Sequence, residues 1–308
     1  MRIVIAGGSG FIGRALADAL VARGDEVTVP TRSPDRAGRV LPPAVTAAAW
    51  DGLDPDALAT IIDGADAVVN LVGANIAEGR WTPAVKRSIV ESRVQAGRAL
   101  AEATHRATTA PHVVVQGSAV GYYGGWSDML TAPVSAEDAP CGAGFLAETC
   151  QQWEASSSDV AEGVRHCVFR TGVVLGKGGA LAKMLPPFRL FAGGPPGTGR
   201  QPFAWIHLSD EVRAIVHLID HATLSGPFNL TAPGCISMAD FCHALGKVLH
   251  RPSFTRVPAP LLRLMLGEMA EEVLLRGQVA PPERLLASGF SFTHTAPIPA
   301  LEDILRRR

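Results

Sequence analysis

Hydrophobic residues follow two different spacings, which alternate over the first 170 positions and return between residues 209 and 230. Short runs of consecutive apolar residues predict strands that are buried on both faces of a parallel sheet. The strands expected from these runs cover residues 2–6, 26–30, 67–72, 112–117, 166–170 and 229–230. Apolar residues that recur every three or four positions predict helices at 11–23, 83–105, 145–160 and 209–220. Strands and helices that alternate in this order predict a doubly wound parallel α/β sheet.

The pattern changes after residue 172. Segments rich in glycine and proline at 176–179 and 192–199 interrupt the alternation, and short helices broken by prolines follow residue 233. We therefore expect a sheet domain with a smaller C-terminal lobe that binds the substrate. The sheet domain is assigned to residues 1–172, completed by 205–232, and the lobe to residues 173–204 and 233–308.

Composition and charge narrow the class of protein. Hydrophobic residues make up 47% of 308 positions, which is enough for a sizeable core. The 28 basic and 29 acidic side chains nearly cancel, so we expect neither nucleic acid nor a membrane as a partner. The sequence opens directly with a strand pattern, so we expect no signal peptide. Its five cysteines are widely spaced without a CxxC motif, so we expect a reduced, cytoplasmic protein that holds no metal.

A glycine-rich turn joins the first expected strand to the first expected helix. It consists of Gly7, Gly8, Ser9, Gly10, Phe11, Ile12 and Gly13. Gly7 permits a tight turn, Gly10 lets the backbone approach a pyrophosphate, and Gly13 lets the helix pack closely on the strand. The N-terminus of the helix offers N–H groups to phosphates. We therefore expect all seven residues to bind a dinucleotide, the alternative being a glycine turn without a ligand.

The residues after the second expected strand decide between the two nicotinamide cofactors. An acidic residue at this place binds the ribose 2′-hydroxyl of NAD, but this chain has Thr31, Arg32 and Ser33. A guanidinium and two hydroxyls suit a 2′-phosphate through charge-assisted hydrogen bonds. We therefore expect NADP(H) rather than NAD. A solvated surface arginine is the alternative for Arg32.

Several segments resemble the extended and atypical short-chain dehydrogenase/reductase superfamily. Besides the glycine turn, they are Asn70-Leu71-Val72-Gly73-Ala74, Ser118 with Gly121-Tyr122-Tyr123-Gly124, and residues 170–176 and 205–210. Other stretches resemble its NAD-dependent epimerase/dehydratase-like subfamily with a small C-terminal domain of unknown function, namely Gly79-Arg80-Trp81-Thr82, His250-Arg251-Pro252 and residues 289–292. The resemblance implies a Rossmann-type fold. It places Leu71, Val72, Gly73 and Ala74 under NADP(H).

The catalytic pair of this superfamily, a tyrosine followed four residues later by a lysine, is absent. Four residues after Tyr122 stands Trp126, and four after Tyr123 stands Ser127. The helix expected from residue 145 contains neither a tyrosine nor a lysine. Another group must therefore move the proton if the protein is an enzyme.

The resemblance places the loop after the fifth strand beside the nicotinamide. Ser118 is therefore expected to hydrogen-bond the substrate oxygen, and either Tyr122 or Tyr123 to exchange the proton. A tyrosine needs a positive neighbour to act near neutral pH, and we expect either the oxidised nicotinamide or Arg93, at the cofactor, to supply it. A capping role for Ser118 and packing roles for the tyrosines are the alternatives.

Two functions remain open at this point. The first is an NADP(H)-dependent oxidoreductase or epimerase-like enzyme for a small carbonyl or hydroxyl substrate. The second is a regulatory or assembly protein that binds NADPH without turnover. Four aromatic residues in or next to the expected lobe suggest an apolar pocket or, alternatively, the core of the lobe, and they are Phe188, Phe191, Phe203 and Trp205. His207 fits a buried structural histidine. Charged residues on the 83–105 helix predict a monomer or weak homodimer.

Overall fold

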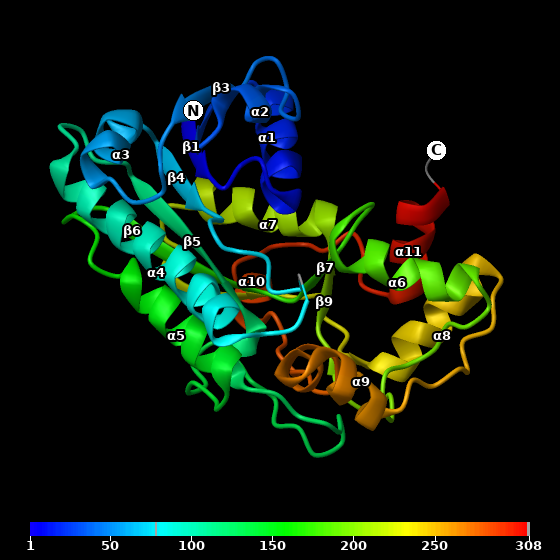
Figure 1. Cartoon of the computed structure of the whole chain (residues 1–308). Helices are drawn as coiled ribbons and strands as arrows, with labels where there is room; N and C mark the ends of the chain where they lie inside the picture. Colours follow the sequence, from blue (N-terminus) through cyan, green and yellow to red (C-terminus); the bar gives the residue numbers. More distant parts are fainter. Residues whose placement is uncertain (78, 307–308) are drawn as a thin grey trace.

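Seven parallel strands form the central sheet of the computed structural model, which describes residues 1–77 and 79–306 (Figure 1). From one edge to the other the strands are β10 (Gly226–Leu230), β6 (Arg165–Thr171), β5 (Val113–Ala119), β4 (Ala67–Asn70), β1 (Arg2–Ala6), β2 (Glu26–Thr31) and β3 (Thr46–Ala49). The chain runs outward from β1 to β3 and then crosses back to β4. The strand order therefore reverses between β1 and β4, which is where ligands bind in open α/β sheets. The prediction of a doubly wound sheet is confirmed.

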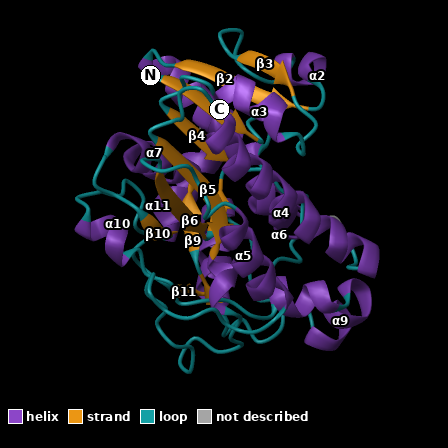
Figure 2. Ribbon diagram, turned by 90° about the vertical axis from the view of Figure 1, so that its left-hand side faces the viewer, coloured by secondary structure: helices purple, strands orange, loops and turns teal. Residues whose placement is uncertain are grey.

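Helices cover both faces of this sheet, and Figure 2 shows the sheet between α4 and α7. One face carries α1 (Phe11–Arg23) and α7 (Leu208–Asp220). The other carries α3 (Pro55–Ile62), α4 (Pro83–Arg106) and α5 (Phe145–Ser156). The remaining helices are α2 (Pro34–Gly38), η1 (Val120–Tyr123), α6 (Gly179–Arg189), α8 (Met238–Leu249), α9 (Ala259–Leu266), η2 (Ala270–Leu274), α10 (Glu283–Ala287) and α11 (Pro297–Arg306).

Helix α5 ends four residues before the expected position. The hydroxyls of Ser156, Ser157 and Ser158 donate to the carbonyl oxygens of Trp153, Glu154 and Ala155, respectively. Serine side chains that bond to nearby backbone groups compete with helix hydrogen bonds. The run of three serines therefore ends the helix before Val160.

The smaller lobe has its own core. Strand β7 (Val173–Leu175) pairs with β9 (Trp205–His207), and β8 (Pro202–Phe203) pairs with β11 (Ile236–Ser237). Phe188, Phe203 and Trp205 are buried there with α8 and α11, so they do not line a substrate pocket. Phe191 is 60% exposed at the surface. The alternative reading as core residues is therefore correct for three of the four aromatic side chains.

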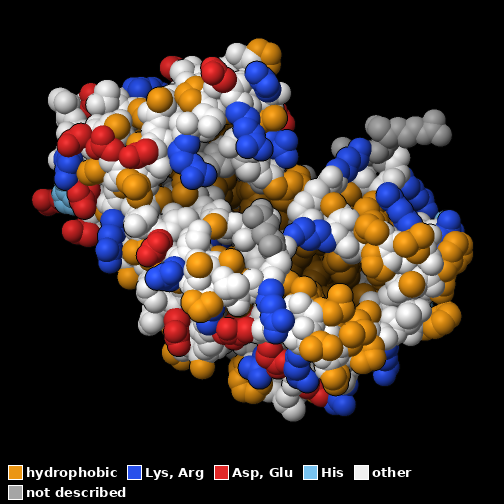
Figure 3. All heavy atoms as spheres, in the orientation of Figure 1, with side chains coloured by type: hydrophobic (Ala, Val, Ile, Leu, Met, Phe, Trp, Pro, Cys, Tyr) orange, Lys and Arg blue, Asp and Glu red, His pale blue; other side chains and the backbone are white. Residues whose placement is uncertain are grey.

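Two segments cross the expected boundary between the domains. Trp205, which we assigned to the sheet domain, belongs to the core of the lobe. Conversely, Leu285 and Phe290 of the expected lobe pack into the core beneath the sheet, because α10 lies against β10 at the sheet edge. The sheet domain and the lobe therefore pack against each other through both segments. Figure 3 shows a hollow between them, with basic side chains on its rim.

Candidate functional site

The β1–α1 loop is held so tightly that its glycines have no room for side chains. Gly7 has a φ of +81°, and a Cβ atom on it would lie 2.7 Å from the carbonyl carbon of Leu71. A Cβ on Gly13 would lie 2.6 Å from the Gly7 oxygen. Gly8 is buried against Val29 of β2. The tight turn expected at Gly7 and the close packing expected at Gly13 are therefore both present.

The N-terminus of α1 opens towards solvent. Gly10 precedes the helix in an extended conformation, and among the described residues no capping side chain accepts a hydrogen bond from the first helical N–H groups. Ser9 and Gly10 are exposed. The side chain of Phe11 packs instead against glycines of the 176–179 segment, and Ile12 packs against the core. Phe11 and Ile12 could therefore meet a cofactor through their backbone rather than through their side chains.

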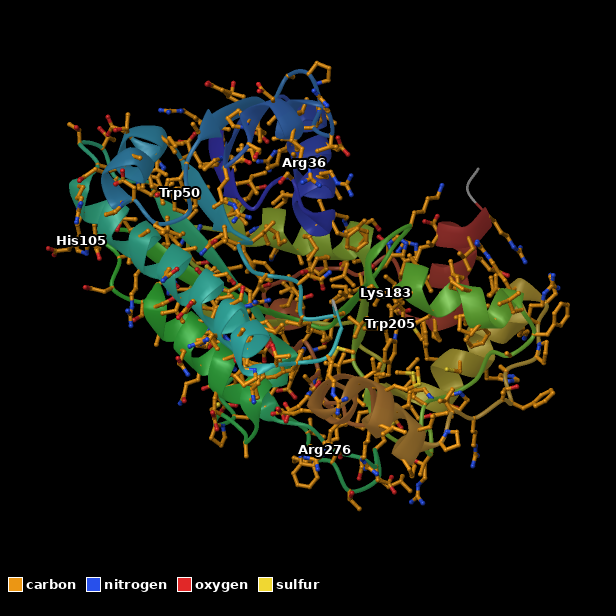
Figure 4. All side chains as sticks on the ribbon, viewed as in Figure 1. Arg36, Trp50, His105, Lys183, Trp205 and Arg276 are labelled. Carbon is orange, nitrogen blue, oxygen red and sulfur yellow. The ribbon has the colours of Figure 1, made fainter. Side chains whose placement is uncertain are left out.

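The end of β2 is basic. Arg32 and Ser33 are exposed, and the hydroxyl of Thr31 accepts a hydrogen bond from the backbone N–H of Ser33. Arg36 is also exposed, one turn into α2, and Figure 4 shows it beside α1. The sequence reasoning missed Arg36, although Ser33 followed by Pro34 is a helix start that places the next turn beside the end of β2.

Helix α4 fixes the loop that follows β4. The hydroxyl of Ser92 accepts a hydrogen bond from the N–H of Ala74 at 3.0 Å, and Arg93 donates from Nη1 to the carbonyl oxygen of Ala74 at 3.1 Å. Asn70 accepts from the N–H of Val72. Leu71 and Val72 are half-buried and Gly73 is exposed. The expected cofactor segment 71–74 thus lies next to the β1–α1 loop, which Leu71 contacts at Gly7.

Buried and partly buried polar side chains from five elements meet at the ends of β5, β6 and β10. We call this set the Arg170 network, and it consists of Ser118, Tyr123, Glu154, Arg170 and Asn229. Arg170 donates to both carboxylate oxygens of Glu154 at 2.8 Å and to the Tyr123 hydroxyl at 2.9 Å. Ser118 donates to Glu154 at 2.6 Å, and Tyr123 donates to Asn229 at 2.7 Å. Each of these bonds joins partners from different elements.

The two tyrosines have different surroundings. Tyr123 is 6% exposed, and burial raises the pKa of its hydroxyl to about 12. Tyr122 is half-buried, and the guanidinium carbon of Arg170 lies 3.6 Å from its ring centroid. Burial also raises the pKa of Tyr122, while the charge of Arg170 opposes that rise. Tyr123 therefore has the position of a packing residue, and Tyr122 is the more accessible acid.

The structure gives Ser118 a different partner from the one expected and adds Glu154 to the site. Ser118 is only 2% exposed, and its proton is directed at Glu154 rather than at the hollow. Glu154 did not emerge from the sequence reasoning at all. The signal that could have found it is a carboxylate on the otherwise apolar face of α5, directly after Trp153. A carboxylate on such a face requires a cationic partner in the fold.

Two histidines that are far apart in sequence stack on each other at the N-terminus of α7. The rings of His207 and His294 lie 3.8 Å apart with an interplanar angle of 22°, and Asp303 of α11 lies beside them. Nδ1 of His207 accepts a hydrogen bond from the N–H of Ser209 and so begins α7. The reading of His207 as a buried structural histidine is confirmed. Nearly parallel rings do not direct their nitrogen lone pairs at one common ion, although the ligand-type atoms lie within 4.8 Å of one another.

Known proteins share this arrangement of sheet, loop and lobe. The sequence profile of the NAD-dependent epimerase/dehydratase family matches residues 3–230. The chain belongs to this family. A domain of unknown function, DUF1731, matches residues 257–304. The resemblance found in the motifs is therefore confirmed, including its C-terminal domain.

Individual members of the epimerase/dehydratase family are similar over almost the whole chain. The chloroplastic epimerase family protein SDR39U1 homolog of Arabidopsis thaliana is 37% identical over 99% of this chain and 87% of its own length. Epimerase family protein Mb2239 of Mycobacterium bovis is 40% identical over 95% of this chain and 93% of its own length. The crystal structure of human epimerase family protein SDR39U1 (isoform2) with NADPH has a TM-score of 0.89 and 34% identity, and covers 100% of both chains. None of the helices described here is long and apolar enough to cross a membrane.

Proposed function

We propose that this epimerase-family protein is an NADP(H)-dependent oxidoreductase or epimerase-like enzyme that acts on a small carbonyl or hydroxyl compound. The observation behind the proposal is the open N-terminus of α1, set above a glycine turn and next to the basic end of β2. A similar chain, human SDR39U1, was crystallised with NADPH. The hollow of Figure 3 adjoins this region and offers space for a substrate.

The residues present fit a phosphorylated dinucleotide. A pyrophosphate needs N–H donors and backbone without side chains, and the uncapped start of α1 with Gly7, Gly10 and Gly13 provides both. A 2′-phosphate needs cations, and Arg32 is exposed at the end of β2 with Arg36 beside it. Leu71, Val72, Gly73 and Ala74 would form the floor between the two halves of the cofactor.

Tyr122 is the proposed proton donor. Bound NADPH supplies a hydride to the carbonyl carbon of the substrate. The carbonyl oxygen then holds the electron pair of the former π bond and takes up a proton. Tyr122 can donate because a tyrosine with its ordinary pKa of about 10 is protonated at neutral pH, and burial raises its pKa further. Arg170, 3.6 Å from the ring centroid, would stabilise the phenolate that remains. Oxidation of a hydroxyl is the same sequence in reverse.

The test has two stages. Calorimetric titration measures the affinity for NADPH and NADH, and NADPH oxidation is then followed with a panel of aldehydes, ketones and quinones. Tyr122→Phe is expected to lose about 10²–10⁴-fold in turnover while it binds NADPH normally, as expected for a general acid. Tyr123→Phe, its matched control, is expected to keep turnover per folded molecule. Ser118→Ala tests whether that hydroxyl orients the substrate oxygen. Full turnover in all three variants would show that the site is misplaced.

A second function has its own support. The proton of Ser118 is directed at Glu154, and Tyr123 is buried with a pKa of about 12, so two of the three expected catalytic groups are engaged within the protein. This favours a regulatory or assembly protein that binds NADPH without turnover. Tight binding of NADPH with no oxidation across the panel would establish this alternative.

The oligomeric state and the compartment are further parts of the proposal. The exposed surface of α4 carries Arg87, Glu91 and Arg98, which disfavours a tightly packed interface between copies. We propose a monomer or weak homodimer in a reducing cytoplasm. Light scattering at micromolar concentration tests the first part, since a stable dimer would contradict it.

A further inference from the structure

Two loops of the smaller lobe expose large apolar side chains to solvent. Leu190 and Phe191 follow α6 and are 77% and 60% exposed, and Phe254 follows α8 and is 81% exposed. Figure 3 shows hydrophobic side chains gathered on the lobe, with basic side chains beside them. We call residues 189–192 and 250–256 the lobe tip. A single exposed leucine or phenylalanine is ordinary, but three of them on two loops form a patch that needs an explanation.

The backbone of Phe191 is strained. Its φ is +62°, in the left-handed region, and among the described residues His250 is the only other non-glycine residue with a positive φ. Glycine is the usual residue at this place after a helix, because a side chain costs free energy there, and a bulky residue is an outlier. The ring of Phe191 recovers little of this cost by burial, since most of it stays exposed. Strain of this kind is typical of segments that bind a partner.

The lobe tip is also basic. Its cations are Arg189, Arg251 and Arg256, which are all exposed. The guanidinium carbon of Arg251 lies 4.4 Å from the centroid of the Phe191 ring, and this contact joins the two loops. In the described part of the chain, none of the three arginines makes an ion pair with a carboxylate. The tip therefore combines apolar side chains with positive charges that the fold does not neutralise.

The charge of the chain is unevenly distributed. Residues 163–209 and 241–267, which contain the lobe tip, carry ten lysine and arginine residues and no acidic residue. All 29 acidic residues lie elsewhere in the chain. The expectation of no membrane partner rests on the net charge of −1, and that value averages a basic tip with an acidic remainder. The local charge, rather than the net charge, decides what a surface attracts.

Exposed leucine and phenylalanine beside uncompensated arginines match the surface of an anionic bilayer. Apolar side chains enter the boundary between headgroups and acyl chains, and basic side chains are attracted to the lipid phosphates. A stable protein interface needs about 800 Å² of matched surface on each partner, whereas three protruding side chains suit a surface that deforms around them. A second copy of the tip would be repelled by its like charge.

We propose that the lobe tip docks the protein on the surface of an anionic lipid bilayer. Leu190, Phe191 and Phe254 enter the interface, and the three arginines contact the lipid phosphates. This contact is peripheral and uses the side chains of two loops. The lobe tip shares no residue with the β1–α1 loop or with the Arg170 network, so the inference does not depend on the proposed function.

The experiment measures by flotation how the full chain distributes between buffer and lipid vesicles. One set of vesicles is pure phosphatidylcholine, and the other contains phosphatidylcholine and phosphatidylglycerol in equal parts. The wild type is expected to bind the anionic vesicles about tenfold more strongly at low salt, and to lose most of this preference at high salt. Phe254→Ser is expected to weaken binding about tenfold, because the inserted ring no longer leaves water. The matched control is Leu53→Ser, whose leucine is 53% exposed in the sheet domain.

Two further pairs of variants separate charge from strain. Reversal of charge in Arg251→Glu combined with Arg256→Glu should abolish the preference for anionic vesicles, while Arg98→Glu, exposed on α4, keeps it. Phe191→Gly and His250→Gly both relieve a positive φ, so the thermal midpoint of each should equal or exceed that of the wild type. Only Phe191→Gly also loses an apolar side chain, so only this variant should bind the vesicles more weakly.

Four results overturn the inference. The first is a wild-type protein that floats with neither set of vesicles. The second is equal binding to both sets, which would show that anionic lipid is not recognised. The third is wild-type binding by Phe254→Ser and Phe191→Gly, which would place the contact on another surface. The fourth is binding to single-stranded oligothymidine but not to vesicles, lost in Phe254→Ser, which would assign the lobe tip to nucleic acid.

Discussion

The β1–α1 loop and the Arg170 network are constructed in opposite ways. The loop is a single stretch of chain in which backbone N–H groups and missing side chains do the work. The network joins side chains from β5, η1, α5, β6 and β10, and every bond in it links different elements. A local backbone site depends on a few glycines. An assembled side-chain site depends on the packing of the whole sheet edge.

This difference also separates binding from chemistry. The glycine turn and the basic end of β2 are exposed and open to a ligand, whereas Ser118, Tyr123 and Arg170 are buried and satisfy one another. Damage to the loop should therefore reduce cofactor affinity with a moderate effect on folding. Damage to the network should mainly lower the free energy of unfolding.

The largest expected effect is the loss of Glu154. Glu154→Gln leaves the buried Arg170 guanidinium without its anion, and breaking a buried ion pair costs about 3–5 kcal/mol. Chemical denaturation measures the change in the free energy of unfolding. The control is Glu148→Gln, whose carboxylate is exposed on the same helix. Equal stability of the two variants would mean that the network does not hold the sheet edge together.

The second largest effect is expected in the pH dependence of stability. It comes from Glu211, which lies fully buried on α7 beside Thr171. Burial raises its pKa to about 8 in the folded protein, whereas an unfolded glutamate has a pKa of about 4.3. The folded state thus keeps the proton that the unfolded state loses. Stability from this group is complete below the unfolded pKa and falls by roughly 1.4 kcal/mol per pH unit up to the folded pKa.

Replacement of Glu211 by glutamine should remove this slope. Denaturation curves at pH 5, 6, 7 and 8 give the free energy of unfolding of the wild-type protein and of Glu211→Gln. As pH rises, the variant should become more stable relative to the wild type. Parallel curves would contradict the prediction. Asp18→Asn, an exposed acid on α1, provides the comparison.

Arg32 tests whether the exposed region around the β1–α1 loop and the end of β2 governs cofactor affinity. Arg32→Ala is expected to weaken NADPH binding by about 1.5–3 kcal/mol, on the scale of hydrogen bonds to charged groups, and to leave NADH nearly unchanged. Titration calorimetry of both cofactors measures it, with the exposed Arg39→Ala as control. Equal losses for NADPH and NADH would indicate that Arg32 serves the pyrophosphate or the fold instead.

The smallest stability change is expected at Gly13. A methyl group there would lie 2.6 Å from the backbone of Gly7 and Gly8, so Gly13→Ala must push the helix away from the turn. Overpacking of this kind costs about 1–3 kcal/mol, and the shifted turn should also bind NADPH less tightly. Gly38→Ala has open space around it and should change neither property. If both alanine variants behave alike, the close packing at Gly13 has no role.

Much of the fold followed from local patterns. The strands are continuous apolar runs and the helices have a 3.6-residue period, so each is specified by residues adjacent in sequence. The glycine turn was equally clear, because a positive φ at Gly7 and close backbone packing at Gly13 are needs that only glycine meets. The predicted end of α5 was wrong, because serine hydroxyls at three consecutive positions compete with the backbone hydrogen bonds of the helix.

The sequence by itself determined the sheet, the turn at Gly7 and the choice of residues at the end of β2, since these depend on chain-local sterics and charge. Only the tertiary structure decided that Ser118 faces Glu154 and that Tyr123 is packed while Tyr122 covers Arg170. The partners in these contacts are brought together by the parallel strands, and Ser118 and Glu154 are 36 residues apart. A side chain's burial and its partners depend on which segments the sheet places together. The sequence order does not contain that information.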